Sequence, residues 1–310
     1  MNELIVLFAS AIVVGTPILY ATLGEILTEK SGNLNLGVEG MMLIGAVVGF
    51  KVGYGSGNPT LAIAAAGAAG AMASLLFGFV TGSLRCNQTI TGLTLTIFGT
   101  GLANFVGGDS VGQRLPASVV DAFRELPIPG LESIPFIGPV FFRQNVLVYF
   151  AYALTAIVAV YLYKTRAGLR LRIVGENPEA ADALGISVSL TKYLHVLVSG
   201  VLSGIGGAYI CCASIPTWQN NIVAGKGWIA VALVIFSRWN PVRALFGTVL
   251  FGLLSILGIR LQKYNLPISQ YIFGMLPYLM TIVILYIGSF RRNKSGEPAG
   301  LGLSWFRETR

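Results

Sequence analysis

The side chains that usually carry covalent or metal chemistry are few and poorly spaced in this chain. The single histidine, His195, begins an apolar run, where a packed or interfacial role is more common than catalysis. Three cysteines, Cys86, Cys211 and Cys212, have no CxxC or metal-ligand spacing, so no redox motif or disulfide framework is indicated. Lys226 lies between two glycines but lacks the rest of a phosphate-binding loop. The sequence therefore predicts no catalytic residue, no metal site and no cofactor bound by this chain, which cannot hydrolyse ATP itself.

Neutral hydrogen-bonding side chains inside apolar runs offer a different chemistry, the replacement of water around a polar solute. Residues 86–108 carry no charge, yet amides and hydroxyls recur among them, including Asn87, Thr91, Thr94 and Asn104. Such groups are costly against lipid and usually face other helices or a cavity. They can also hydrogen-bond between helices without touching a substrate. Because the polar positions are many, we favour a face that lines a translocation pathway.

A glycine-rich polar stretch leads into the second apolar run. Asn35 and Glu39 are followed directly by residues 40–50, which are too few to cross a bilayer core alone. Three charged residues before them suit a membrane surface: Glu25, Glu29 and Lys30. A broken or re-entrant helix is predicted, because irregular backbone survives at membrane depth only when protein buries it. Asn35 and Glu39 would then form either a hinge or gate near the pathway or a clasp between helices.

Composition places these residues in an integral membrane protein of many helices. Of 310 residues, 54% are hydrophobic and 11% are charged, which is too little charge to cover a soluble globule. The mean hydropathy is +0.73. The 39 glycines suit close helix packing in lipid. The formal charge of +8 lies mainly in the loops and the tail. This distribution is typical of cations that set the orientation of a membrane protein, and it does not indicate a nucleic-acid partner.

Apolar runs predict an all-α polytopic fold with about nine crossings, within a range of roughly eight to ten. The runs are residues 4–23, 40–50, 60–84, 86–108, 145–163, 193–225, 227–237, 244–259 and 264–290. The short runs 40–50 and 227–237 suit broken or half helices. The positive-inside rule puts the more basic face in the cytoplasm and the N-terminus outside. We expect one transmembrane domain, residues 1–290, and a basic, poorly ordered cytoplasmic tail, residues 291–310.

One long polar segment, residues 164–192, interrupts the apolar runs and contains a short helix signal. Asn177 can cap a helix, Pro178 suits its first position, and Gly185 can end its last turn. The predicted helix has about two turns and needs support from neighbours or from a docked protein. The segment is therefore either an ordinary interhelical loop or a lever between membrane helices and a soluble motor. Spacing alone favours the loop.

Three motifs together carry a family resemblance: GEILTEKSGNLNLGVEGMMLIGA at 24–46, VGENPEAADALGIS at 174–187 and SGVLSGIGGAYI at 199–210. They resemble permease subunits of bacterial ATP-binding-cassette (ABC) importers, in the family of ribose and branched-chain amino-acid permeases and within its nucleoside and simple-sugar branch. The resemblance spans essentially the whole chain. It implies that residues 164–192 are a cytoplasmic coupling loop whose short helix docks in the ATPase. This interpretation replaces the ordinary interhelical loop that spacing alone favoured. It assigns this coupling to Gly175, Glu176, Asn177, Pro178, Ala180, Ala181, Leu184 and Gly185.

The resemblance also implies partners and a location. The chain would be a multi-pass protein of the bacterial cytoplasmic membrane that forms half of a pathway for nucleosides, with simple sugars such as ribose as the alternative. A second permease subunit, often a different chain, an ATPase that binds ATP and Mg, and an extracytoplasmic binding lipoprotein would complete the complex. A self-sufficient ion-coupled transporter or channel is another alternative, but it would carry coupling charges near the midplane. Glu39 and the helix-end Asp109 give little support for that mechanism.

Overall fold

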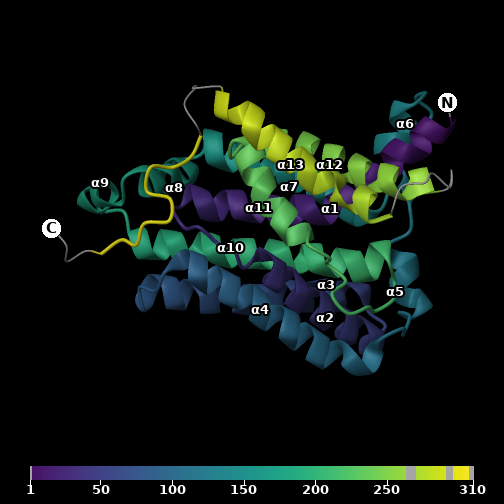
Figure 1. Cartoon of the computed structure of the whole chain (residues 1–310), viewed down its shortest axis with the longest axis horizontal. Coiled ribbons are helices and arrows are strands. Elements are labelled where there is room, and N and C mark those ends of the chain that lie inside the picture. Colours follow the sequence, from purple (N-terminus) through teal and green to yellow (C-terminus); the bar gives the residue numbers. More distant parts are fainter. Residues whose placement is uncertain (1, 263–269, 291–295, 307–310) are drawn as a thin grey trace.

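The computed structural model describes residues 2–262, 270–290 and 296–306, and these form an all-α bundle along one long axis (Figure 1). The α-helices are α1 Asn2–Lys30, α2 Val38–Ser56, α3 Pro59–Gly78, α4 Gln88–Gly107, α5 Ala117–Ala122, α6 Ile137–Phe141, α7 Val146–Lys164, α8 Arg166–Glu176, α9 Pro178–Ala183, α10 Val188–Tyr209, α11 Lys226–Ser237, α12 Pro241–Gln262 and α13 Gln270–Phe290. Two π-helical segments, η1 Phe79–Ser83 and η3 Ile210–Ser214, extend α3 and α10, and η2 Gly108–Ser110 follows α4. A short antiparallel pair joins β1 Leu126–Pro127 to β2 Arg143–Gln144, with Leu126 opposite Gln144.

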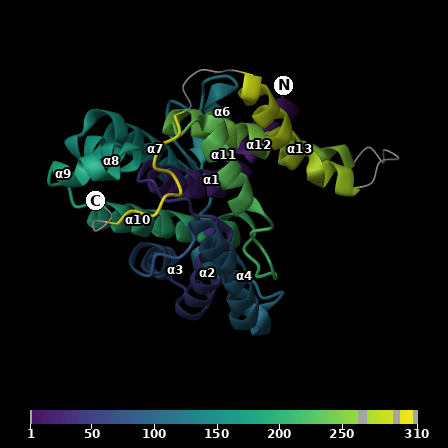
Figure 2. The same ribbon diagram turned by 60° about the vertical axis from the view of Figure 1, so that its left-hand side comes forward.

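The predicted all-α polytopic class is confirmed. Within the described residues, seven helices are long and apolar enough to cross a membrane. The nine predicted runs correspond there to α1, α2, α3, α4, α7, α10, α11, α12 and α13, of which α11 is shorter. α10 lies in the middle and packs against α1, α2 and α3, while α12 packs on the other side of α1 (Figure 2). The N-terminus and helices α8 and α9 lie at opposite ends of the bundle (Figure 1).

Small residues let α2, α3 and α10 approach one another closely, as the glycine content predicted. Gly204 of α10 lies against Ala66 and Gly70 of α3, and it also meets Gly45 of α2. A Cβ atom on Gly70 would lie 2.9 Å from the Cα of Gly204, which no real side chain tolerates. These glycines therefore fix the centre of the bundle by backbone contact.

Replacing Gly204 by valine should disrupt this crossing, because the added atoms meet the backbone of two neighbouring helices. We expect a loss of roughly 3 kcal/mol or more in the free energy of unfolding, the upper end for overpacking. The loss of stability is measured by the monodisperse fraction on size-exclusion chromatography and by the melting temperature in mild detergent. Gly101→Val is the matched control, since a Cβ on Gly101 of α4 meets nothing within 4 Å. Equal behaviour of the two variants would contradict this packing.

The charged end of α1 differs from expectation. Residues expected at the membrane surface are covered by protein, with Glu25 0% and Glu29 1% exposed. The indole N–H of Trp239 donates to Glu29 at 2.6 Å, and Lys30 donates to the carbonyl of Gly296 at 2.6 Å. Buried charges are tolerated because they are hydrogen-bonded. α1 therefore continues as a helix beyond the predicted residue 23.

The predicted poorly ordered tail is also wrong for residues 296–306, which fold back over the ends of α8 and α10 (Figure 1). The rest of that predicted tail, residues 291–295 and 307–310, lies outside the described residues.

Candidate coupling surface and translocation pathway

The short helix predicted in the polar segment exists as α9, and its ends are capped as expected. The side-chain oxygen of Asn177 accepts a hydrogen bond from the backbone N–H of Ala180 at 2.9 Å. Pro178 is the first helical residue, and Gly185 has a φ of 76°, the left-handed conformation that glycine adopts readily. Local sequence was sufficient to predict this helix, because the residues that cap it lie directly at its two ends.

A second helix before α9, α8, was not predicted. Thr165 caps it by accepting a hydrogen bond from the N–H of Gly168 at 3.0 Å. Leu171 and Val174 are buried on its inner face, while the arginines of the segment made it resemble a loop. The signal was present in Thr165, a preferred cap residue, ahead of a run with apolar residues at helical spacing. α8 and α9 together project from one end of the bundle (Figure 2).

The residues assigned to ATPase coupling divide into an outer and an inner set. Five of them are exposed: Glu176, Asn177, Ala180, Leu184 and Gly185. The side chain of Leu184 is 70% exposed at the end of α9, which is not one of the helices long enough to cross a membrane. Two others face inward. Ala181 is 0% exposed, and a Cβ on Gly175 would meet the carbonyl of Lys30.

A partner can therefore touch only the outer set, while Gly175 and Ala181 hold the helices in place. Pro178 lies between the two sets and is partly buried. Glu179 and Ala183, which the resemblance did not assign, are exposed on the outer side of α9 as well. The coupling role of all these residues stays a prediction.

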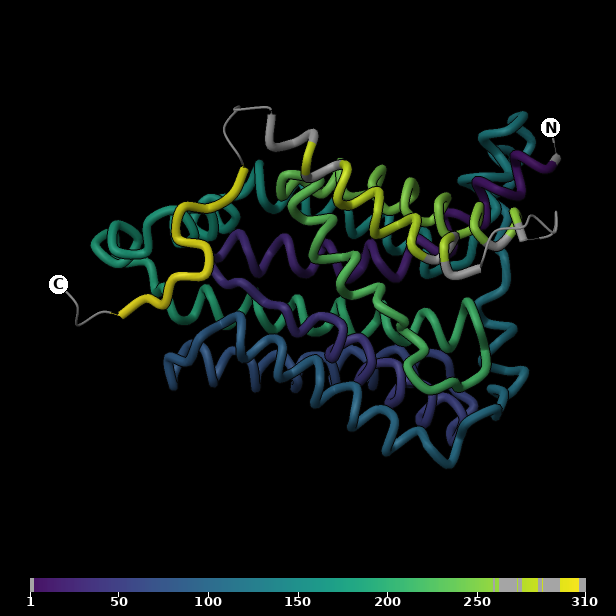
Figure 3. Tube along the Cα trace, in the orientation of Figure 1, coloured from purple at the N-terminus to yellow at the C-terminus, as the bar shows by residue number. Residues whose placement is uncertain are grey.

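The predicted broken helix is present at residues 31–37, which run into the bundle without helical structure before α2 begins (Figure 3). Side chains satisfy the freed backbone groups. The N–H of Leu34 donates to Gln88 at 2.7 Å, that of Asn35 donates to Glu25 at 3.2 Å, and the hydroxyl of Thr96 donates to a carbonyl of this segment at 2.9 Å. These partners explain how irregular backbone is stable between membrane helices.

Glu39 joins this break to a second one. Residues 215–225 are also irregular, and α11 begins directly after them. One carboxylate oxygen of Glu39 accepts from the N–H of Gly225 at 2.8 Å, and the other accepts from that of Gly227 at 2.6 Å. Glu39 itself lies in the first turn of α2, so one carboxylate serves two helix N-termini. These contacts are those of a clasp between α2 and α11, and a gating role stays a proposal.

The remaining pathway candidates lie along α4 and are not brought together with Asn35 and Glu39. Asn87 caps the helix by accepting from the N–H of Ile90 at 3.0 Å, and Thr91 donates to the carbonyl of Asn87 at 2.8 Å. At the other end, the side-chain oxygen of Asn104 accepts from the N–H of Asn221 at 3.3 Å. These polar groups support the helix and the 215–225 loop, as the interhelical alternative anticipated.

Thr94 differs from those groups, because it lies on the exposed face of α4. Its neighbours on that face are large apolar residues and a glycine: Ile90, Ile97, Phe98, Gly101 and Phe105. Among the six pathway candidates, Thr94 and Asn87 are the exposed ones, and of these two Thr94 is the one within α4.

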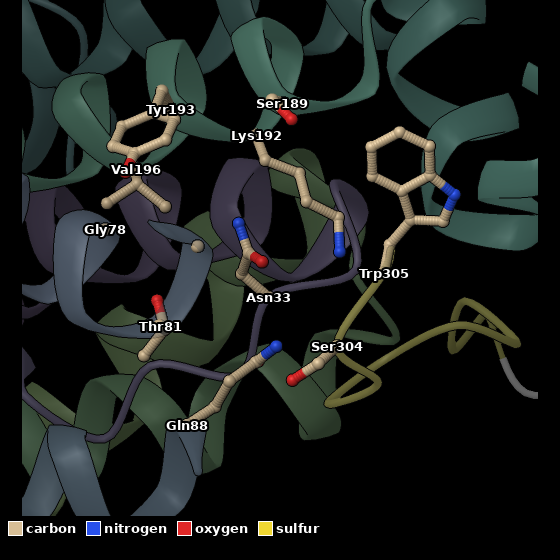
Figure 4. A pocket seen from close by; sticks show the side chains of 11 residues that line it. Asn33, Gly78, Thr81, Gln88, Ser189, Lys192, Tyr193, Val196, Ser304 and Trp305 are labelled. Atoms are coloured by element: carbon tan, nitrogen blue, oxygen red, sulfur yellow. The ribbon is translucent and has the colours of Figure 1, made fainter. Parts of the chain in front are cut away.

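Sequence reasoning missed a polar cavity of about 40 Å³ between residue 33, the end of α3 and the start of α10. The ammonium group of Lys192 and the amides of Asn33 and Gln88 border it together with Ser304, near the amide of Gln88, and Trp305 (Figure 4). These residues are far apart in the chain, so no local pattern could have predicted their meeting.

Residues 7–285 match the family described as branched-chain amino acid transport system / permease component. The chain belongs to this permease family. The permease is therefore a multi-pass membrane protein that serves transport and is not an enzyme. Its fold resembles a solved structure described as an inward-facing conformation of a metal-chelate type ABC transporter, with a TM-score of 0.54 and 17% identity over 91% of this chain and 85% of the other.

Several relatives resemble the permease over most of its length. The nucleoside ABC transporter permease protein NupC of Lactococcus lactis is 36% identical over 92% of each chain. The guanosine ABC transporter permease protein NupQ of Bacillus subtilis is 34% identical over 98% of each. A protein of Haloferax volcanii named as a glucose ABC transporter permease, TsgC13, is 37% identical over 94% of this chain and 95% of its own.

Cysteine labelling should separate exposed from structural positions on α4. In a Cys86→Ser background, Thr94→Cys should react with a small water-soluble thiol reagent at least about tenfold faster than Thr96→Cys, since thiol reactivity depends on access. Thr94 is exposed, while Thr96 is 9% exposed and engaged with the backbone before α2. Labelling rates followed by mass spectrometry measure the difference. Inertness of both positions would place Thr94 against lipid or another subunit.

Proposed function

We propose that this permease is the transmembrane subunit of an ATP-driven importer for nucleosides and forms half of the translocation pathway. The observation that carries the proposal is α9, a capped helix held at one end of the bundle with the apolar side chain of Leu184 exposed. An exposed leucine on so short a helix suits insertion into a cleft of a partner protein. The ATPase would bind there, with ATP and Mg on its own subunit.

The complex requires a second permease, and we propose that it is a different chain. The relatives occur in pairs of unequal similarity. NupQ is 34% identical to this permease, whereas NupP of the same bacterium, also a guanosine ABC transporter permease protein, is 24% identical. In Haloferax volcanii, TsgC13 is 37% and TsgB13 is 28% identical. A partner of the second kind would face this permease across the pathway, and a binding lipoprotein would dock at the opposite end from α9.

Nucleosides are the proposed substrates because NupC and NupQ are named for nucleoside and guanosine transport. Simple sugars remain the second candidate, because TsgC13 is named for glucose. The exposed hydroxyl of Thr94 suits either substrate, since a neutral group can replace water around a sugar hydroxyl without desolvating a charge. Ion coupling has less support, since both carboxylate oxygens of Glu39 accept backbone hydrogen bonds.

Reconstitution tests this function directly. The permease would be placed in proteoliposomes with a candidate ATPase, second permease and binding protein. We expect uptake of labelled guanosine and uridine to require ATP on the side of the membrane that carries the ATPase. Ribose and glucose should be transported far less. Uptake by the permease alone, driven by an ion gradient without ATP, would contradict the proposal. Preferential uptake of glucose would move the substrate to simple sugars.

A further inference from the structure

Residues 296–306, called the strap from here on, cross the inner end of the bundle between α1 and α8 (Figure 1). They are tied down by main-chain and side-chain hydrogen bonds at several points. The N–H of Gly300 donates to the carbonyl of Gly175 at 2.9 Å, and the N–H of Gly302 donates to that of Gly32 at 3.1 Å. The strap therefore bonds both to the end of α8 and to the residues that follow α1.

Two further hydrogen bonds extend this attachment. Lys30 donates to the carbonyl of Gly296 at 2.6 Å, and the N–H of Ala299 donates to the carboxylate of Glu176 at 3.2 Å. Glu176 is one of the residues expected to couple to the ATPase. The strap thus contacts the coupling segment itself and not only the membrane helices.

Apolar side chains anchor the strap at two places. Leu301 packs against a cluster from α1, α7 and α8 that includes Ile26 and Leu171. Trp305 packs against a second cluster, formed by Val174 of α8, Ala181 of α9 and Val188 of α10. Beyond it, the guanidinium of Arg85 lies 4.5 Å from the ring centre of Phe306. Trp305 consequently helps to cover the cluster in which the buried face of α9 meets α8 and α10.

Glycine permits the close crossing at which the strap meets both segments. A Cβ on Gly300 would lie 2.8 Å from the carbonyl oxygen of Gly175, and one on Gly32 would lie 3.2 Å from that of Gly300. Gly32 also has a φ of 86°, which favours glycine. Three glycines from distant parts of the chain thus meet by backbone contact, so the path of the strap is specified and is not a loose association.

We propose that the strap is a transmission element that carries movement of α8 and α9 to the inner ends of the membrane helices. The inference rests on the proposed function, because it assumes that an ATPase moves α9. A six-residue helix cannot transmit force alone, but its buried Ala181 belongs to the cluster against which Trp305 packs, and the same strap is bonded to Gly32. Gly32 belongs to the irregular segment 31–37 that leads to Glu39. Asn33 of the same segment borders the polar cavity together with Ser304 and Trp305 (Figure 4).

Trp305→Ala in the reconstituted complex tests the strap. We expect the ATPase to copurify and to hydrolyse ATP at its basal rate, while nucleoside uptake per ATP hydrolysed falls by about tenfold, the upper range for loss of a coupling contact. Leu303→Ala is the matched control on the same strap, since Leu303 is 63% exposed. It should stay within about twofold of wild type, as expected for a surface substitution.

Gly302→Ala gives a milder test that avoids loss of folding. Gly302 has a φ of 76°, and the nearest atom to an added Cβ is 3.9 Å away, so alanine strains the backbone without a clash. Uptake per ATP should fall by about threefold with normal assembly. Wild-type coupling in both variants, or loss of assembly in both without any change in coupling, would overturn the strap proposal. If the wild-type complex needs no ATP, the proposed function itself fails.

Discussion

Replacing Leu184 by arginine is expected to detach the ATPase from the permease while the permease still inserts and folds. Leu184 is 70% exposed at the end of α9, so the unbound protein loses little when it is changed. In the complex, burial of a leucine contributes about 2 kcal/mol, and burial of an unpaired guanidinium adds a further cost. Together they weaken binding by roughly 100-fold or more. Copurification of the ATPase in detergent and ATP-driven uptake measure the effect.

Two comparison variants test whether the lost apolar contact of Leu184 accounts for the detachment of the ATPase. Leu184→Met keeps a flexible apolar side chain of similar size and should retain binding and uptake. Ala181→Arg should instead lower the amount of folded permease, because Ala181 is 0% exposed against Val174 and Val188. Normal copurification of the ATPase with Leu184→Arg would show that the exposed end of α9 is not the docking site.

Replacing Glu39 by alanine should lower the free energy of unfolding of the permease by about 2–6 kcal/mol. The variant leaves the N–H groups of Gly225 and Gly227 without their acceptors inside the bundle. Each unsatisfied group costs about 1–3 kcal/mol, and a whole domain is stable by only about 5–15 kcal/mol. We expect little monodisperse protein and a melting temperature at least several degrees lower. Thermal unfolding in detergent checks it, with Glu125→Ala as control, because Glu125 is an exposed acid paired with Arg143.

Glu39→Gln separates the clasp from a gate. The amide keeps one acceptor oxygen but turns an N–H toward the other backbone donor, so an intermediate loss of about 2 kcal/mol is expected for a clasp. A variant that folds and assembles like wild type but does not transport would indicate a gate. Normal stability together with normal transport of Glu39→Ala would contradict both, because the carboxylate would then be dispensable at this junction.

Sequence predicted those parts of the fold whose determinants are close together in the chain. Asn177, Pro178 and Gly185 all lie within or beside α9, so its existence and ends could be inferred from them. The crossings follow from uninterrupted apolar runs, and the break before α2 follows from a run too short to span. Their partners could not be inferred, because Gln88 and Gly225 meet residues 34 and 39 only after the bundle has formed.

The error in the tail has the same physical origin. The tail is basic in sequence, yet residues 296–306 are ordered by backbone bonds to Gly32 and Gly175, which no local pattern reveals. α8 was missed for a different reason, because its arginines outweighed a local signal that was present in the Thr165 cap and in the helical spacing of Leu171 and Val174. Resemblance supplied a set of coupling residues but not their orientation, so Ala181 and Leu184 were grouped although one is buried and the other exposed.

The contact between Glu39 and α11 also constrains how the protein reaches the membrane. Gly225 and Gly227 follow Glu39 by 186 and 188 positions, so their N–H groups do not exist when α2 leaves the ribosome. At roughly 5–20 residues per second, about 10–40 s pass before α11 is made. During that interval the carboxyl group of Glu39 lacks both backbone partners, so it must be protonated, hydrated or covered by other protein. Nascent chains that stop before residue 226 should therefore be recognised by membrane proteases as unfinished.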